Sequence, residues 1–404
     1  MINIKIRNIL LSTLILSGTL IIGGCSDENS TSNNVSTSSS AIIESTKEEV
    51  IAQNNNYSNP CYPVSNGVKK ETYMPDPYVI RDESTGIYYL YCTQTDVFES
   101  DSNDFRTFKR GPVFSSMNGV DWKYTANVFE NYEPNWGTSG AGVWAPTVCK
   151  VGDYYNFYYS LSVGGDANPG IGVARSKTPY GPFEHYGKLF NSNEIGVTNS
   201  IDPYVFYDDD KLYMAWGSFG GLITIVDLEA DGLSLKGGLQ NQYDKKVAIA
   251  GYELNESKNY EGTIIIKKDG KYYLFLSTGT CCSGVNSTYH VVVATSDNLF
   301  GPYTDSKGRN MFGPDRGDYV VTPSKTAGVM GVGHNGFLVD DNGDYWMIYH
   351  GYDTKATSHS DWRVTYLDKL LWDKETKLPY IENRRASNHE EKPGPYIKAL
   401  EENN

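Results

Sequence analysis

Five short segments of the chain share one pattern and begin with residues that could do chemistry. The segments start at Asp76-Pro77, Ala145-Pro146, Asp202-Pro203, Glu261-Gly262 and His334-Asn335. Each continues as a short strand-like run, a polar turn and an aromatic run. Four of the five leading residues are titratable, and three are carboxylates. If these positions converge, the carboxylates raise each other's pKa values, as the groups of an acid–base site do.

Three converging carboxylates suit the hydrolysis of a glycosidic bond. A carboxylic acid protonates the leaving oxygen, and a carboxylate activates water or attacks the sugar. A third carboxylate keeps the acid protonated near neutral pH. An Asp before Pro is also common in turns, but that explanation covers neither the Glu nor the His. We therefore predict Asp76, Asp202 and Glu261 as catalytic, and His334 as a metal or bridging-water residue.

The spacing of the segments predicts the elements that position these residues. The leading residues lie 69, 57, 59 and 73 positions apart (145 − 76, 202 − 145, 261 − 202, 334 − 261). From about residue 60, β-rich runs alternate with Gly, Pro, Asn and Asp turns, and no long helical period occurs. Five four-stranded units at this spacing predict an all-β fold, a five-bladed β-propeller whose inner strands line a central channel.

Composition narrows the choice of partner. The net charge of −14 argues against a nucleic-acid partner, which would require a basic face. The chain contains 32 Tyr, 14 Phe and 7 Trp, and aromatic rings suit both β-cores and sugar stacking. Trp144 directly precedes the second repeated segment, and Phe219 follows the second run of the third. Both are candidate platforms for sugar rings, although either could simply fill the core between blades.

The N-terminus predicts export. Lys5 and Arg7 precede a mostly apolar run from Ile9 to Ile22, which has the length of a signal sequence and is short for a membrane span. It ends in Gly23-Gly24-Cys25, resembling a bacterial lipobox in which the Cys is lipidated. The alternative is an ordinary signal peptide. We expect a signal peptide over 1–24, a Ser/Asn/Thr-rich tether over 25–58, a propeller over 59–404, and a cell-surface lipoprotein anchored to the membrane by lipid alone.

Five cysteines remain after Cys25. An odd number does not suggest a disulfide framework, and no spacing suggests structural zinc. Two of the five, Cys281 and Cys282, are adjacent. On sequence alone the pair is a family marker and carries no redox role.

Six motifs, in this order, resemble glycoside hydrolase family 43 over about residues 70–382. They are Pro75-Asp76-Pro77, Val143-Trp144-Ala145-Pro146, Asn199-Ser200-Ile201-Asp202-Pro203, Tyr260-Glu261-Gly262, the segment 281–289 (CCSGVNSTY) and Gly333-His334-Asn335-Gly336. The resemblance implies a five-bladed propeller that hydrolyses with inversion. It implies Asp76 as general base, Glu261 as general acid, Asp202 as the residue that raises the pKa of Glu261 and orients it, and His334 beside a calcium ion bound largely through water.

Trp144-Ala145-Pro146 and the segment 281–289 are similar to the endo-α-1,5-L-arabinanases of that family. This likeness implies an arabinan or arabinoxylan-type saccharide as substrate, bound by Trp144, Asn199, Ser218 and Phe219. Two departures leave endo or exo action open: Phe219 is followed by Gly220 and not by a second aromatic, and Gly262-Thr263 stands where those enzymes often have Ala-Pro.

Three other readings remain. An α-L-arabinofuranosidase or a β-xylosidase would use the same three carboxylates. A retaining fructan-type propeller hydrolase would need motifs that fail here at Asp76, Asp202 and Glu261. A surface sugar-binding lipoprotein would be expected to lack one of the three. Inversion further predicts that the Asp76 and Glu261 carboxyls lie about 6.5–9.5 Å apart, whereas about 5 Å would indicate retention.

Overall fold

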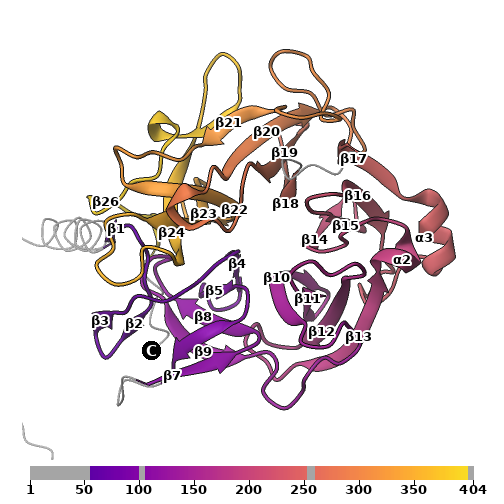
Figure 1. The fold of residues 1–404 in the computed structure, drawn as a ribbon, viewed down its shortest axis with the longest axis horizontal. Coiled ribbons are helices and arrows are strands. Elements are labelled where there is room, and N and C mark those ends of the chain that lie inside the picture. Colours follow the sequence, from indigo (N-terminus) through magenta and orange to yellow (C-terminus); the bar gives the residue numbers. More distant parts are fainter. Residues whose placement is uncertain (1–54, 100–104, 253–259, 399–404) are drawn as a thin grey trace, which may run out of the picture. The chain divides into compact units, whose positions relative to one another are not determined.

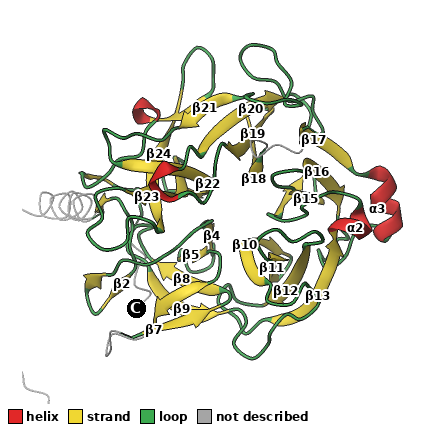
Figure 2. Ribbon diagram, in the orientation of Figure 1, coloured by secondary structure: helices red, strands yellow, loops and turns green. Residues whose placement is uncertain are grey.

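A computed structural model describes residues 55–99, 105–252 and 260–398, all within a compact unit that spans Glu48–Asn404. In this unit five antiparallel four-stranded sheets stand around a common centre (Figure 1). Strands and loops make up almost all of it, and the few helices are short (Figure 2). The predicted five-bladed propeller is confirmed.

The blades follow one another along the chain, and each is built from a local stretch of sequence. Blade 1 contains β4 (Tyr78–Arg81), β5 (Tyr88–Tyr91), β8 (Pro112–Ser116) and β9 (Lys123–Asn127). Blade 2 contains β10 (Gly142–Val151), β11 (Tyr154–Ser162), β12 (Gly170–Ser176) and β13 (Glu184–Asn191). Blade 3 contains β14 (Tyr204–Asp208), β15 (Lys211–Trp216), β16 (Leu222–Asp227) and β17 (Val247–Gly251). Blade 4 contains β18 (Glu261–Lys268), β19 (Lys271–Thr278), β20 (His290–Ser296) and β21 (Asp318–Val321). Blade 5 contains β22 (Val329–Val339), β23 (Tyr345–Asp353), β24 (Arg363–Trp372) and β25 (Pro379–Ile381).

Most of the other elements lie outside the five four-stranded sheets. They are the paired strands β2 (Val64–Ser65) and β3 (Val68–Lys69), the hairpin β6 (Thr95–Phe98) and β7 (Arg106–Lys109), the helices α2 (Ser192–Ile195) and α3 (Leu239–Lys245), and the 3-10 turns η1 (Gly284–Asn286) and η2 (Glu382–Arg384). Among the described residues, none of the helices is both long enough and apolar enough to cross a membrane.

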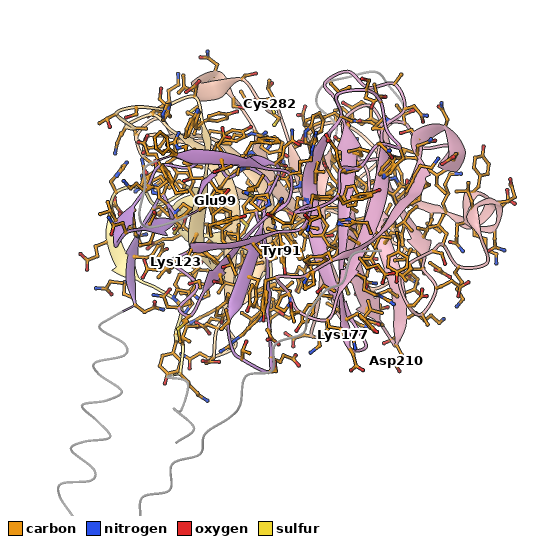
Figure 3. All side chains as sticks on the ribbon, turned by 90° about the horizontal axis from the view of Figure 1, so that it is seen from below. Tyr91, Glu99, Lys123, Lys177, Asp210 and Cys282 are labelled. Atoms are coloured by element: carbon orange, nitrogen blue, oxygen red, sulfur yellow. The ribbon has the colours of Figure 1, made fainter. Side chains whose placement is uncertain are left out.

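The first hairpin of each blade turns on the face opposite the start of its inner strand. Asp269-Gly270 joins β18 to β19 with φ of 52° and 78°, the conformation that a tight two-residue hairpin requires. Asp209 and Asp210 turn β14 into β15 in the same way. Figure 3 shows Asp210 and Lys177 at one end of the propeller and Cys282 at the other. The leading residues therefore lie toward the end that carries Cys282.

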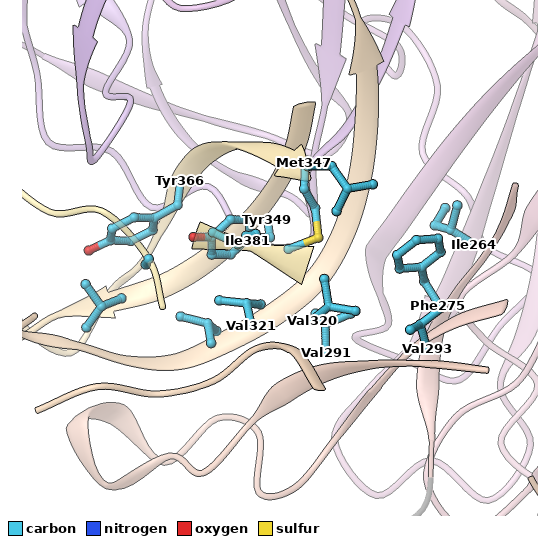
Figure 4. Packing of buried hydrophobic residues seen from close by; sticks show 14 of the residues in the cluster. Ile264, Phe275, Val291, Val293, Val320, Val321, Met347, Tyr349, Tyr366 and Ile381 are labelled. Carbon is cyan, nitrogen blue, oxygen red and sulfur yellow. The ribbon is translucent and has the colours of Figure 1, made fainter. Parts of the chain in front are cut away.

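The core lies between the blades, where the faces of neighbouring sheets meet. Between blades 4 and 5, Phe275, Val293 and Met347 are completely buried (Figure 4). Burying an aliphatic or aromatic side chain of this size contributes about 1.5–3 kcal/mol. Because such packing occurs at each boundary, the blades hold one another at defined angles around the channel.

The first and last strands of the described region pair with each other. β1 (Asn56–Ser58) forms an antiparallel ribbon with β26 (Glu391–Pro393), and the Tyr57 ring packs edge-on against Trp346 at a centroid distance of 6.0 Å. The folded region therefore includes residues 55–58, and the predicted tether boundary at residue 58 is too late. Tyr57 supplies the physical reason, because it is a buried core residue. The expected signal peptide, Cys25 and the rest of the tether lie outside the described residues.

Candidate active site

One backbone feature recurs at the start of the inner strands and directs side chains to the channel. Asp76, Ala145, Asp202 and His334 all adopt left-handed backbone conformations, with φ of 57°, 40°, 61° and 51°. In blade 4 the equivalent residue is Gly262, with φ of 60°. Strand pairing skips this position in blades 2, 4 and 5, which is the mark of a bulge that re-aims a side chain.

This feature corrects the sequence alignment of the repeats by one residue in blade 4. Glu261 pairs with Ser277 as Trp144 pairs with Ser160, so Glu261 corresponds to Trp144 and not to Asp76. A Cβ on Gly262 would lie 3.2 Å from the His334 ring, which explains why glycine stands there. The acid candidate therefore enters the channel from one position earlier in its strand than the two Asp residues.

A second repeat, missed in the sequence, fastens the leading residues. The backbone N–H groups of four of them donate to a polar side chain at the end of the second strand of the preceding blade. These bonds run from Asp76 to His350 (3.2 Å), Ala145 to Thr93 (2.8 Å), Asp202 to Ser160 (2.8 Å) and His334 to Ser277 (2.8 Å). In each case a Ser, Thr or His after an aromatic run is the sequence signal. These bonds fix each of the four leading residues to the preceding blade.

The predicted site residues gather in one cleft. Its volume is about 520 Å³, and its lining includes Asp76, Asp202, Glu261, His334, Trp144, Asn199, Ser218 and Phe219. Thus the structure brings together every candidate that sequence reasoning named within the described residues. The same lining adds Thr93, Arg363 and the Cys281-Cys282 pair, none of which was predicted as a site residue.

Asp76 is buried and surrounded by donors. Thr93 donates its hydroxyl to Oδ2 at 2.6 Å, and Arg363 donates to Oδ1 at 3.1 Å. His334 Nδ1 lies 3.3 Å from the same Oδ1. Burial raises the pKa of Asp76, but Arg363, His334 and His350 outweigh burial and hold it well below its usual range. Asp76 is therefore an ionised carboxylate near neutral pH.

His350 contacts Asp76, and the His350 ring is uncharged near neutral pH. Burial lowers the pKa of His350 to about 4, and its Nδ1 accepts a hydrogen bond from the backbone N–H of Asp76. The same Nδ1 lies 3.2 Å from Asp76 Oδ1. The Tyr289 ring stacks on His350 at a centroid distance of 5.6 Å.

Glu261 and Asp202 have the opposite electrostatic character to Asp76. Burial, followed by the repulsion of Glu261 and Asp76, raises the pKa of Asp202 well above its usual range. Burial is also the main cause that raises the pKa of Glu261. The Ser218 hydroxyl and the Tyr289 hydroxyl each donate to a Glu261 oxygen at 2.6 Å. The two carboxyls titrate as a pair and together retain a proton in conditions where Asp76 has lost its own.

The four predicted saccharide contacts have different positions in the cleft. Trp144 lines the cleft and stands directly before the bulge in blade 2. Asn199 Nδ2 donates to the Phe219 carbonyl at 2.9 Å and so holds the loop that carries the ring. Phe219 packs edge-on against Tyr289. Ser218 is buried and bonded to Glu261, so it positions the acid candidate.

Arg363 is the functional residue that the repeats could not indicate. It lies at the start of β24, a third strand, and reaches Asp76 across 287 residues of sequence. Its guanidinium also donates to the Tyr73 hydroxyl at 2.6 Å. Its only local signal is a charged residue that follows Trp362 and opens β24.

The donor set at the channel axis fits a hard cation such as calcium. One ligand atom from each of Asp202, Glu261 and His334 lies within 4.8 Å of the other two. A small cavity beneath them is lined by His334, Thr263 and Asn335. Thr263 Oγ1 and both polar atoms of the Asn335 side chain, Oδ1 and Nδ2, are buried there without a hydrogen-bond partner among the described residues. Calcium prefers oxygen ligands and tolerates water in its shell, so these unpaired oxygens match its chemistry.

Comparison with known proteins places this site in a family. The chain matches the model of glycosyl hydrolases family 43 over residues 64–377. It is 30% identical over 300 residues to an extracellular exo-α-(1→5)-L-arabinofuranosidase of Cellvibrio japonicus, covering 70% of this chain and 80% of that protein. It is 30% identical over 208 residues to an extracellular endo-α-(1→5)-L-arabinanase of Bacillus subtilis, covering 49% of this chain and 61% of that protein.

A solved structure supports the same assignment. The α-L-arabinanase of Cellvibrio cellulosa, in complex with arabinohexaose, superimposes with a TM-score of 0.64 at 26% identity, over 78% of this chain and 96% of that one. The family match extends over the whole segment that carries the three carboxylates. The chain belongs to glycoside hydrolase family 43 and is a glycosidase.

Proposed function

We propose that this protein hydrolyses α-L-arabinofuranosidic bonds in arabinan with inversion of configuration. The observation that carries the mechanism is the opposite electrostatic environment of two carboxyls in one cleft. Burial raises the pKa of Asp76, and Arg363 is the strongest of the groups that oppose burial and hold this pKa low. The pKa of Glu261 is raised by burial. Relatives named for arabinan hydrolysis support the choice of sugar.

In this mechanism Asp76 is the general base. Its ionised carboxylate accepts a proton from a water molecule, which attacks the anomeric carbon from the face opposite the leaving group. Thr93 and Arg363 hold the carboxylate from two sides, so its orientation changes little during the reaction. Their hydrogen bonds also keep the base ionised before substrate binds.

Glu261 is the general acid, and Asp202 tunes it. Glu261 donates its proton to the leaving oxygen. Asp202 titrates together with Glu261 and disfavours a second negative charge. The Ser218 hydroxyl accommodates both states of Glu261, because a hydroxyl accepts as well as donates a hydrogen bond. Trp144 and Phe219 supply flat apolar faces for the sugar rings.

We also assign a calcium ion to the channel axis, held by His334, Thr263 and Asn335 largely through water. The unpaired oxygens around the small cavity support this assignment. An ion held there would supply positive charge close to the carboxylates. The site residues named above carry out the proton transfers themselves.

Export and anchoring complete the proposal. The signal sequence and Cys25 predict a lipoprotein at the bacterial cell surface, and relatives named as extracellular enzymes support export. At the surface, the tether would hold the cleft within reach of plant cell-wall arabinan.

Glu261→Gln provides the decisive experiment, with Glu375→Gln as its control because Glu375 is exposed and lies outside the cleft. General acid catalysis contributes roughly 10²–10⁴-fold. We expect kcat on linear arabinan to fall by that factor in Glu261→Gln and to be unchanged in the control. Unchanged activity of Glu261→Gln would refute the assigned acid.

Product analysis tests the substrate and stereochemistry independently. NMR of the first product formed from linear arabinan should show the inverted anomer. Cleavage of xylan in preference to linear or branched arabinan would favour the β-xylosidase alternative. Release of single arabinose units alone would indicate exo action, and release of mixed oligosaccharides would indicate endo action.

A further inference from the structure

Two adjacent cysteines form part of the cleft wall. Cys281 and Cys282 lie in the loop between β19 and β20, and both line the cleft with Arg363 and the catalytic carboxyls. Cys282 is exposed, and Cys281 is partly exposed. Figure 3 shows Cys282 at one end of the propeller, far from the Asp210 turn. Reagents in solution therefore reach the pair from the same side as substrate.

The loop that carries the pair holds both sulfurs together. The Cys281 and Cys282 Sγ atoms lie 2.7 Å apart. The neck of the loop is closed by two hydrogen bonds, from Thr280 N–H to Thr288 Oγ1 (2.9 Å) and from Ser287 Oγ to the Thr280 carbonyl (2.5 Å). Cys282 has a left-handed backbone, with φ of 61°. The pair is thus already arranged for bond formation between its two sulfurs.

The same surroundings favour reaction at Cys282. The hydrogen bond with Cys281 lowers the pKa of the Cys282 thiol, and Arg363 adds to that effect against burial. A thiolate is the species that attacks a disulfide. By contrast, Cys61 is fully buried in the core, where burial raises its thiol pKa to about 12.

We propose that Cys281 and Cys282 are a redox-controlled wall of the saccharide cleft, in which a vicinal disulfide strengthens substrate binding. This inference rests on the proposed function, because the bound molecule is the saccharide of that reaction. It assigns to the pair a role that adjacency in the sequence did not suggest. The placement of both sulfurs inside the cleft is what carries it.

The oxidation is a thiol–disulfide exchange with a small-molecule disulfide, RSSR. The Cys282 thiolate attacks one sulfur of RSSR, and RS⁻ leaves as a mixed disulfide forms. The Cys281 thiol then loses its proton and attacks Cys282 Sγ, which expels the second RS⁻. Overall, two thiols and RSSR become one protein disulfide and two RSH. An exported protein meets the oxidising surroundings in which such a bond persists.

Oxidation changes the cleft wall in two physical ways. It replaces two thiols joined only by a hydrogen bond with one small covalent ring, so less freedom is lost when a saccharide binds. It also removes two S–H groups and leaves a compact apolar surface. Neighbouring Cα atoms are 3.8 Å apart, closer than in ordinary disulfides. Because such a bond is strained, a dithiol reductant should reopen it.

The test compares the enzyme in oxidised and reduced glutathione with the same enzyme in dithiothreitol. Alkylation and mass spectrometry of a peptide that contains both cysteines report the disulfide as the loss of two hydrogens and of both alkylation sites. Kinetics on arabino-oligosaccharides report its effect. We expect KM to be about two- to tenfold lower in the oxidised enzyme, the gain from fixing one or two mobile side chains, with a smaller change in kcat.

Two variants separate this effect from general oxidation. Cys282→Ser should have the same KM under both conditions, whereas Cys149→Ser should keep the response, because Cys149 lies outside the cleft lining. Failure of the peptide to lose two hydrogens, or an equal KM in both states, would overturn the inference. If the disulfide forms but neither state cleaves arabinan, the proposed function fails and the cleft-wall role fails with it.

Discussion

Arg363 offers the sharpest test of how the cleft sets the charge of its proposed base, Asp76. Its guanidinium donates to Asp76 Oδ1 at 3.1 Å, and after burial it is the largest influence on the pKa of that carboxyl, which it lowers. Arg363→Met removes the charge and keeps a long apolar side chain. The pKa of Asp76 should then rise, because the variant retains burial and loses the main group that opposes it.

The magnitude follows from the kind of bond that is lost. A hydrogen bond to a charged group contributes about 1.5–3 kcal/mol, and one pKa unit corresponds to about 1.36 kcal/mol. The pKa of Asp76 should therefore rise by about one to two units. Because the base works ionised, the acidic limb of the kcat/KM profile should move to higher pH by the same amount, whereas the alkaline limb should change less.

The assay is kcat/KM on an arabino-oligosaccharide across the pH range in which each variant stays folded by circular dichroism. Arg363→Lys keeps a positive charge and should restore most of the wild-type acidic limb. Arg81→Met is the matched control, since Arg81 pairs with Asp341 at 2.6 Å and lies outside the cleft lining. An acidic limb that stays in place in Arg363→Met would refute the reasoning.

Three further predictions follow from neighbouring features. Asp202→Asn removes a charge coupled to Glu261, so the alkaline limb of kcat/KM should move to lower pH; a limb that moves upward contradicts the assigned role. The Gly262→Ala variant should lose more thermal stability and activity than the Gly270→Ala variant. Both positions have positive φ, but only a Cβ at residue 262 would meet a side chain, that of His334. Equal losses in the two variants would argue against that contact. Burial raises the pKa of Asp368 to about 6 in the folded state, above about 3.9 unfolded, so its stabilisation is present below pH 4 and lost as pH rises through 6. Urea titrations should show the free energy of unfolding of the wild type falling by up to about 3 kcal/mol between pH 4 and pH 7, relative to that of Asp368→Asn. An equal pH dependence of the two proteins would contradict this pKa.

Much of the architecture could be predicted from the sequence because blades are local structures. Each blade folds from a continuous stretch, so its strand, turn and aromatic run recur as a readable period. Residues at corresponding places in different blades must then converge on the axis. That geometry allowed Asp76, Asp202 and His334 to be grouped before any contact was known.

The one-residue error at Glu261 has an equally physical origin. A repeat read by residue type aligns Glu with Asp, whereas the blades are aligned by backbone conformation. The left-handed position falls on Gly262, whose hydrogen side chain avoids the His334 ring. Only the strand register shows that the acid candidate stands one place earlier, in the position of Trp144.

The carboxylates and the ring that presents them follow from the sequence alone, because both depend on residue type and local period. The charge state of those carboxylates was decided by tertiary structure. Arg363 comes from a third strand, where no repeat marks it, and His350, although it recurs at the end of a second strand, meets Asp76 only where blade 5 closes against blade 1. Electrostatic interactions act through space, and the pKa of Asp76 depends on contacts with Arg363 and His350, which lie 287 and 274 positions away along the chain.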